Sequence, residues 1–300
     1  MTEQANILAQ FSNALIESNV AANARVAAIQ ITTGRYITGS VWRSDVVITS
    51  EQSLPGREEF DLMAAGGATV KAKTVGRDVG TNLAVLKLEE PLSAANVVSA
   101  GAHVGALAVA FGADGGGHAT ARLGVVNTVA CEWYSSHGGR IEQKIVLDIE
   151  LARSEEGGPV FDASRGLLGM TTFGPRRQVL VIPTATIERI VPILLRHGRI
   201  ARGWLGVALR PVAVPEALEK AAGQSSGLMV MSLTDGGPAA NAGIVAGDII
   251  LSVDGASTRR MRNITARLGA ESIGRGVDLR FIRGGAVTSR QTTITERPSS

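Results

Sequence analysis

The residues of this sequence that could do chemistry are mainly acidic. Glu155 and Glu156 are adjacent and precede Gly157-Gly158-Pro159, and Glu51 and Asp148 are further carboxylates that a fold could bring to the same place. A pair of carboxylates can transfer protons or hold a metal ion. The spacing of these residues gives no support to such a site, so acid–base chemistry stays an alternative to a structural role.

Histidine and cysteine add little chemistry. The four histidines, His103, His118, His137 and His197, are far apart and are expected in loops or on the surface rather than as ligands. Cys131 is the single cysteine, which excludes an internal disulfide framework and a zinc site built from cysteines. We therefore expect no metal and no cofactor, and a buried thiol at Cys131.

Composition and charge are those of an ordered protein. The chain has 300 residues, of which 45% are hydrophobic and 19% charged, and its formal net charge is +3. These values argue against disorder and predict two domains. The small basic clusters Arg176-Arg177 and Arg259–Arg262 are interpreted as solvated surface, so no nucleic-acid partner is expected.

The first residues lack the features of an export signal. The first basic residue is Arg25, and Glu3 and Glu17 lie where a signal peptide needs a positive segment and an apolar segment. The longest apolar candidate, Val97 to Ala113, contains His103 and several glycines, so it is not a convincing membrane span. These observations predict a cytoplasmic protein without a membrane span.

Short strand-like runs dominate the first 200 residues. Gly, Pro, Asp and Asn separate many of them, a pattern typical of a barrel or a sandwich. Examples are Val26–Thr32, Val46–Thr49, Thr69–Val75, Leu83–Leu88, Leu107–Phe111, Leu123–Val129, Lys144–Ile149 and Leu167–Thr172. An amphipathic helix is expected over Ala5–Val20, and a second helix over Pro183–His197 ends at Gly198.

After the short connection Arg199–Gly203, the remaining residues mix strands and helices. Strands are expected at Trp204–Leu209, Gly227–Leu233, Asp248–Val253, Val277–Arg283 and Val287–Thr295, and helices at Pro215–Ala222, Pro238–Ala242 and Arg260–Leu268. This is the size of one small α+β domain. We therefore expect domains at residues 1–200 and 203–297.

Four motifs in the second segment resemble a PDZ domain of the bacterial HtrA type. They are Arg202–Val207, Gly237–Gly243, Ala246–Ile250 and Val253–Gly255, in the order found in that family. The resemblance implies that an extended peptide adds to the sheet edge and that its terminal carboxylate meets backbone N–H groups of a glycine-containing loop. That loop would be Trp204, Leu205, Gly206 and Val207. The alternative is a PDZ scaffold with an occluded groove that only docks against its neighbour.

The first segment is similar to the trypsin-like double β-barrel of the same HtrA proteases. The similarity is carried by Gly39–Val41, Val46–Thr49, Leu83–Lys87, Val109–Gly112, Leu123–Val126, Gly157–Val160 and Ile182-Pro183. The expected fold is therefore mainly β: a trypsin-like double β-barrel followed by an α+β PDZ domain.

Such proteases use a serine nucleophile, a histidine base and an aspartate that orients the histidine. By position, the resemblance puts Gln52, Asn82 and Glu156 where the family has histidine, aspartate and serine. Glutamine cannot act as a base, asparagine has no charge to stabilise an imidazolium, and glutamate puts negative charge beside the oxyanion hole. No histidine lies in the segment after Thr49, so a shift of register does not restore the triad.

The sequence therefore predicts a pseudoprotease without catalytic residues, which binds peptides or protein C-termini through its PDZ domain in bacterial protein quality control. An active serine endopeptidase of the HtrA family is the alternative. A third hypothesis is a regulatory subunit, because the helix around Ile7–Ile16 could support a trimer or assembly with an active paralogue. The same helix could instead cap the barrel.

Overall fold

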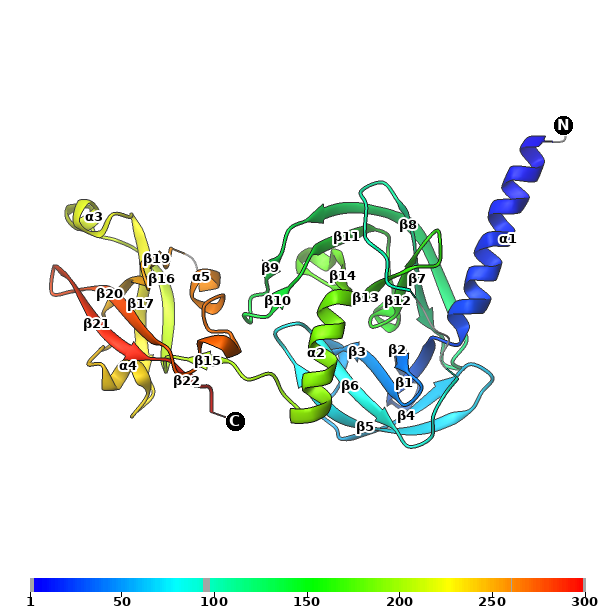
Figure 1. The fold of residues 1–300 in the computed structure, drawn as a ribbon, viewed down its shortest axis with the longest axis horizontal. Helices are drawn as coiled ribbons and strands as arrows, with labels where there is room; N and C mark the ends of the chain where they lie inside the picture. Colours follow the sequence, from blue (N-terminus) through cyan, green and yellow to red (C-terminus); the bar gives the residue numbers. More distant parts are fainter. Residues whose placement is uncertain (1–2, 94–97, 260, 299–300) are drawn as a thin grey trace. The chain divides into compact units, whose positions relative to one another are not determined.

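The structure is a computed structural model that describes residues 3–93, 98–259 and 261–298 (Figure 1). The chain divides into two compact units. The first comprises Met1–Trp133 and Ile141–Ile200, and the second comprises Tyr134–Arg140 and Ala201–Ser300. Arg260, a member of one predicted basic cluster and of a predicted helix, lies outside the described residues.

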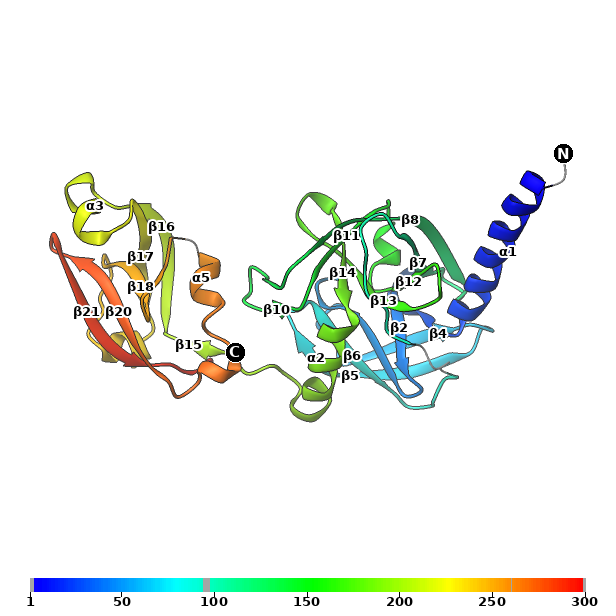
Figure 2. The same ribbon diagram turned by 45° about the horizontal axis from the view of Figure 1, so that its top comes forward.

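Six antiparallel strands close the first barrel of the first unit (Figures 1 and 2). They are β1 (Val26–Thr32), β2 (Arg35–Arg43), β3 (Val46–Ser50), β4 (Glu59–Ala64), β5 (Thr69–Asp78) and β6 (Leu83–Leu88), joined in the order β1-β2-β3-β6-β5-β4. Successive side chains of a β-strand point to opposite faces of the sheet, so every second side chain points into the barrel. In β4, for example, Phe60, Leu62 and Ala64 are buried between more accessible residues.

A second closed barrel completes the first unit. Its strands are β7 (Leu107–Ala113), β8 (Ala119–Ala130), β11 (Lys144–Asp148), β12 (Pro159–Asp162), β13 (Leu167–Phe173) and β14 (Val179–Pro183), in the order β11-β14-β13-β12-β7-β8. The short strands β9 (Trp133–Tyr134) and β10 (Arg140–Ile141) pair with each other. The prediction of a mainly β protein with a double barrel is confirmed.

Two helices belong to the first unit. The predicted second helix is α2 (Thr184–His197), and Gly198 ends it in the left-handed conformation (φ 73°), with its N–H donating to the Leu194 carbonyl at 2.8 Å. The first helix, α1 (Glu3–Asn23), is longer than predicted and leaves much of its apolar surface exposed. No helix in the described ranges is both long and apolar enough to cross a bilayer.

The expected burial of Cys131 is wrong. Cys131 follows the last residue of β8, Ala130, and is exposed. Because the barrel strand ends before it, its side chain is not directed into the barrel core.

The second unit is built on one twisted sheet. Its strands run in the order β16 (Val207–Ala213), β17 (Ser226–Leu233), β18 (Ile249–Val253), β20 (Gly276–Arg283) and β21 (Ala286–Thr293), and β19 (Ala256–Ser257) pairs with β18. The helices are α3 (Glu216–Ala222), α4 (Pro238–Asn241) and α5 (Met261–Thr265), and β15 (Gly203–Trp204) pairs with β22 (Thr295–Glu296). The core contains Leu228, Val230 and Phe281 from the sheet and Ile264 from α5.

Glu142, which precedes β11, anchors the second barrel to α2. Its carboxylate accepts hydrogen bonds from Arg189 Nε at 2.5 Å and from the Thr186 hydroxyl. Burial alone would raise the pKa of Glu142, but the hydrogen bonds from Arg189 and Thr186 and the charge of Arg189 together outweigh burial and lower the pKa.

A lowered pKa in the folded state means that ionised Glu142 stabilises the fold above its ordinary pKa, and that this contribution is lost as the pH falls through the lowered value. We expect Glu142→Gln to reduce the free energy of unfolding by about 1 kcal/mol at neutral pH. Urea denaturation at neutral pH and at about pH 4 measures the effect. The difference between wild type and variant should shrink at the lower pH, and an equal difference at both would contradict the assignment.

Candidate functional site

The three residues predicted at the triad positions come together in the first unit. Gln52 lies in the short 3-10 turn η1 (Glu51–Ser53) after β3, Asn82 directly precedes β6, and Glu156 directly follows the turn η2 (Arg153–Glu155). Gln52 Nε2 donates to Glu156 Oε1 at 2.5 Å, and the backbone N–H of Gln52 donates to Asn82 Oδ1 at 2.8 Å. Loops of both barrels therefore meet at one polar cluster.

The Glu156 carboxylate forms the centre of this cluster. The donors to Oε1 are the hydroxyls of Ser50 (2.8 Å) and Thr172 (2.9 Å), Gln52 Nε2 and the backbone N–H of Phe173 (3.1 Å), and the donor to Oε2 is the Ser53 hydroxyl. Glu156 is only 3% exposed. An ionised carboxylate can only accept hydrogen bonds, so five donors satisfy it where water does not reach. We call these residues, together with Asn82, the Glu156 cluster.

Two hydroxyl groups link Asn82 to Glu156. Asn82 Nδ2 donates to Ser50 Oγ at 2.9 Å and to Thr172 Oγ1, and both hydroxyls donate onward to Glu156 Oε1. Ser50 Oγ thus accepts one hydrogen bond and donates another, while Thr172 Oγ1 also accepts a second hydrogen bond from Gln52 Nε2 at 3.2 Å. The Asn82 amide is fixed in one orientation, because its oxygen accepts from the Gln52 backbone N–H.

The Glu156 cluster contains no histidine. All four histidines are described, and none of them is among the hydrogen-bond partners of Gln52, Asn82 or Glu156. Ser50 donates to a carboxylate, as an activated nucleophile would, but its side chain is fully buried. A nucleophile must reach the substrate carbonyl, so Ser50 cannot perform that step in this conformation.

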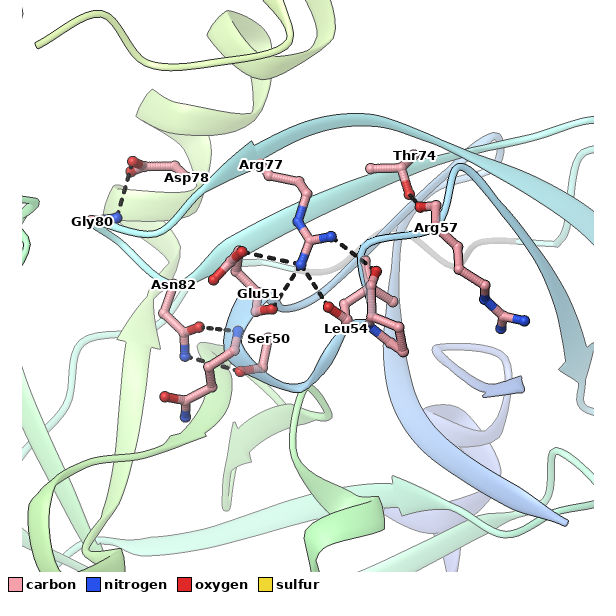
Figure 3. Close-up of polar contacts among 11 residues, drawn as sticks. Ser50, Glu51, Leu54, Arg57, Thr74, Arg77, Asp78, Gly80 and Asn82 are labelled. Atoms are coloured by element: carbon pink, nitrogen blue, oxygen red, sulfur yellow. Dashed lines mark hydrogen bonds and ion pairs between the residues drawn. The ribbon is translucent and has the colours of Figure 1, made fainter. Parts of the chain in front are cut away.

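The last two residues of β5 hold the two loops that carry Gln52 and Asn82 (Figure 3). The Arg77 guanidinium donates to the carbonyls of Pro55 (2.9 Å), Glu51 (3.1 Å) and Leu54 (2.6 Å), and it pairs with the Glu51 carboxylate at 3.0 Å. It therefore fixes the turn that presents Gln52.

Asp78 does the same for the loop before β6. Its carboxylate accepts the backbone N–H groups of Gly80 (3.1 Å) and Thr81 (3.0 Å) and the Thr81 hydroxyl (2.7 Å). Asn82 then adopts the left-handed conformation, with φ 56°. Asparagine tolerates this conformation better than most residues do, so the loop geometry and the residue type agree.

We expect Arg77→Lys to lower the free energy of unfolding by about 1–3 kcal/mol, because a single ammonium group cannot replace a guanidinium that serves three carbonyls and a carboxylate. Urea denaturation measures this loss. The matched control is Arg43→Lys at an exposed position, where a change within about 0.5 kcal/mol is expected. Equal stability of the two variants would show that Arg77 does not hold the turn.

The alternative of a carboxylate site is not supported by the geometry. Glu155 is buried and turns away from Glu156, accepting Arg122 Nε (3.0 Å), the Thr120 hydroxyl (3.0 Å) and the Ala152 N–H (2.8 Å). Glu51 pairs with Arg77 instead. In the described part of the chain, no group of three or more His, Cys, Asp or Glu residues could hold a metal ion.

The two glycines after Glu156 are required by packing. A Cβ at Gly157 would lie 2.3 Å from the Thr38 carbonyl oxygen, and a Cβ at Gly158 would lie 1.8 Å from that of Phe111. These distances are far below van der Waals contact, and Gly157 also has a φ of 93°. Gly157 therefore permits the close approach of this loop to β2 of the first barrel, and Gly158 permits its close packing on β7 of the second barrel.

Sequence analysis missed most donors of the Glu156 cluster. The hydroxyls of Ser50, Ser53 and Thr172 and the Phe173 N–H were not among the predicted site residues. Ser50 and Ser53 flank Gln52 within one turn, so a local concentration of hydroxyl donors was visible. Thr172 comes from β13, and the pairing of β12 with β13 brings it to Glu156.

A second candidate site lies in the second unit, at the loop Trp204, Leu205, Gly206 and Val207. The predicted strand Trp204–Leu209 is broken there, because Gly206 is in the left-handed conformation (φ 73°) between β15 and β16. The Leu205 carbonyl accepts Ala239 N–H and the Gly206 carbonyl accepts Thr234 N–H, both at 2.9 Å. A trans peptide directs its C=O and N–H to opposite sides, so the N–H groups of Gly206 and Val207 point away from these donors.

A pocket of about 250 Å³ opens beside this loop. Its apolar lining comes from Leu205, Val207, Leu209, Met261, Ile264 and Leu268. The predicted helix Arg260–Leu268 is shorter than expected, since α5 covers Met261–Thr265 and Leu268 follows it. An apolar pocket next to backbone N–H groups can receive an apolar side chain and a carboxylate at the same time.

Comparison with known proteins agrees with both units. Residues 37–170 match the trypsin-like peptidase domain family, and residues 203–294 match the PDZ domain family. The chain is 29% identical over 263 residues to a Brucella suis protein named "Probable periplasmic serine endoprotease DegP-like", covering 84% of this chain and 51% of that protein. It is 28% identical to "Protease Do-like 1, chloroplastic" of Arabidopsis thaliana, covering 87% and 64%. The chain thus spans about half the length of its bacterial relative.

Solved structures show the same fold. The structure titled "HtrA-type protease AlgW with decapeptide" matches with a TM-score of 0.71 at 21% identity, covering 94% of this chain and 98% of the other. A serine endoprotease from Yersinia pestis matches with a TM-score of 0.69 at 22% identity, covering 94% and 97%.

The expected cytoplasmic location is wrong. Relatives from Brucella suis, Bartonella henselae and Halomonas elongata are all named periplasmic serine endoproteases. The expectation relied on the acidic first residues, and the relatives outweigh that argument.

Proposed function

Since the chain belongs to the HtrA-type family, with a trypsin-like peptidase domain followed by a PDZ domain, we propose that it is a proteolytically inactive member that binds peptides or protein C-termini. The observation that carries this proposal is the Glu156 carboxylate, buried among five donors where the family has its nucleophile. Gln52 and Asn82 occupy the positions of base and orienting carboxylate.

The chemistry of these replacements supports the loss of proteolysis. Gln52 has no basic nitrogen, and its amide already donates to Glu156 and to the Phe173 carbonyl at 3.1 Å. A buried carboxylate next to the place of the scissile carbonyl would oppose the negative charge that develops on that oxygen. The site therefore favours a structural role for Glu156, which joins loops of both barrels.

The loop and pocket of the second unit support peptide binding. The N–H groups of Gly206 and Val207 point away from the donors to the loop carbonyls, and the apolar pocket lies beside them. An extended peptide would add to β16 and place its carboxylate at this loop. Trp204, Leu205, Gly206 and Val207 are the residues we propose to contact the peptide terminus.

An active serine endopeptidase is the second candidate, because the relatives are named serine endoproteases. A fluorophosphonate that labels activated serines separates the two. No labelling is expected for this protein, and stoichiometric labelling would overturn the assignment of an inactive site.

The exposed side of α1 supports assembly with other subunits. Its large apolar side chains Ile7, Leu8, Phe11, Ile16 and Val20 are 40–72% exposed. We propose that this surface joins copies of the chain in a homo-oligomer, a trimer in the simplest case, or joins it to an active paralogue. We place this assembly in the periplasm, the compartment in the names of the bacterial relatives.

Casein degradation by carefully purified protein tests the proposal directly. Neither wild type nor Glu156→Gln should release peptides from casein, while an active trypsin-like protease in a parallel reaction does. Cleavage by wild type that disappears in Glu156→Gln would overturn the inactive assignment and make Glu156 catalytic. Equal cleavage by both proteins, abolished by a further purification step, would identify a contaminant and support the inactive assignment.

A further inference from the structure

The pocket beside the loop Trp204–Val207 and the open edge of β16, which we call the peptide groove, carry basic residues. Resting on the proposed peptide binding, we propose that the groove prefers C-termini that carry Asp or Glu at the fourth residue from the end. The ligand class is therefore an acidic C-terminal peptide with apolar residues at its last and third-last positions.

The open edge of β16 limits how much of a peptide can be bound. Within the described residues, β16 pairs with β17 alone, so its other edge is free for an added strand. Pro211 lies in β16 and has no N–H, and proline is accommodated in edge strands with its nitrogen toward the open edge. Backbone pairing from Val207 therefore stops before Pro211, which leaves about four residues of β16 to pair with the peptide.

Strand alternation assigns the peptide positions. Val207 and Leu209 line the pocket, so Ala208 and Arg210 face the other side of the sheet. A peptide with its carboxylate at the Gly206 loop runs antiparallel to β16, and paired residues then share a face. The last and third-last residues oppose Val207 and Leu209 and enter the apolar pocket. The fourth-last residue opposes Arg210.

The charged residues that line the pocket are Arg202 and Arg297. Arg210 is exposed, and its side chain forms neither a hydrogen bond nor an ion pair with any described residue. The backbone N–H of Arg297 donates to the Arg202 carbonyl at 2.9 Å, and the Arg202 side chain donates to the Gly138 carbonyl. Among the residues that the structure describes, no Asp or Glu lines the pocket. A carboxylate opposite Arg210 gains an ion pair, and a lysine there meets only like charge.

Three fluorescein-labelled peptides ending in X-Val-Ala-Val, with a free carboxylate and X as Glu, Gln or Lys, test the proposal by fluorescence anisotropy with the full chain. We expect the Glu peptide to bind roughly two- to fivefold more tightly than the Gln peptide, as for an exposed ion pair, and the Lys peptide to bind weakest. The preference should fall as NaCl is raised from about 50 mM to about 500 mM, because salt screens exposed charges.

Two variants identify the residue responsible. Arg210→Gln should remove the difference between the Glu and Gln peptides. The matched control, Arg290→Gln, removes the same charge from β21, the strand at the opposite edge of the sheet. This variant should retain the difference between the Glu and Gln peptides. Equal binding of all three peptides by wild type overturns the charge preference and leaves peptide binding intact. Binding of none of the three overturns the proposed peptide binding itself, and the preference with it.

Discussion

Glu156→Ala is expected to lower the free energy of unfolding by about 3–4 kcal/mol, one of the largest effects of any single substitution in the first unit. The substitution removes one acceptor group and leaves five donors behind. A buried donor without a partner costs about 1–3 kcal/mol, and water entering the new space offsets part of the sum. Equilibrium unfolding in urea, followed by tryptophan fluorescence, measures the change, since Trp42 and Trp133 belong to the first unit.

Two further variants show whether the donors are the cause. Glu156→Gln keeps the shape but offers one acceptor oxygen and adds an NH₂ group among donors, so we expect a loss of about 1–2 kcal/mol. Glu59→Ala removes a carboxylate that is 67% exposed on β4, and a change within about 0.5 kcal/mol is expected. If Glu156→Ala were as stable as Glu59→Ala, Glu156 would not be the centre of a structural cluster.

The positions of Gln52, Asn82 and Glu156 could be predicted because each lies beside a short motif whose place in the fold is constrained. Gln52 follows the buried strand β3, Asn82 directly precedes β6, and Glu156 precedes a Gly-Gly pair that packing requires. The motifs that carry the family resemblance therefore predicted which loops hold these residues, and the structure brings the three together. It could not reveal that the Glu156 carboxylate would be satisfied by donors rather than exposed to substrate.

The missed partners come from segments far apart in the chain. Ser50 and Ser53 reach Glu156 from 106 and 103 residues away in the chain, and Arg77 on β5 reaches Glu51 from 26 residues away. Contacts of this kind follow no periodic pattern in the sequence, so residue spacing could not predict them. The strand predicted over Trp204–Leu209 is interrupted for a related reason. Gly206 adopts the left-handed conformation there, while the Leu205 and Gly206 carbonyls accept hydrogen bonds from Ala239 and Thr234, which are distant in the chain.

For α1, the sequence predicted the helix but not the surroundings of its apolar side chains. Its apolar spacing was recognised correctly, but spacing alone does not say what covers an apolar surface. Leu15 and Ala22 pack near the barrel, while Ile7 and Leu8 are 62% and 72% exposed. Only the C-terminal part of the helix therefore caps the barrel, and the rest is free for the assembly we propose.

Gly206→Val is expected to weaken binding of the Glu-Val-Ala-Val peptide at least about tenfold, equivalent to 1.4 kcal/mol. At Gly206 a Cβ would lie 3.3 Å from the Gly237 Cα and 3.3 Å from the Trp204 ring, and φ is 73°. A β-branched residue is strongly disfavoured in that conformation, so the loop must move. Moving it displaces the N–H groups of Gly206 and Val207 that would hold the peptide carboxylate.

Gly255 supplies the matched control for this prediction. It has a φ of 72°, and nothing lies within 4 Å of a Cβ built there, so Gly255→Val carries the same backbone strain at a turn away from the groove. Both variants should lose comparable stability in urea, but only Gly206→Val should lose peptide affinity, measured by fluorescence anisotropy. Because the backbone strain is similar in the two variants, a lower peptide affinity of Gly206→Val alone would show that the geometry of this loop is needed for binding. Wild-type affinity in a folded Gly206→Val variant would exclude this loop as the carboxylate site.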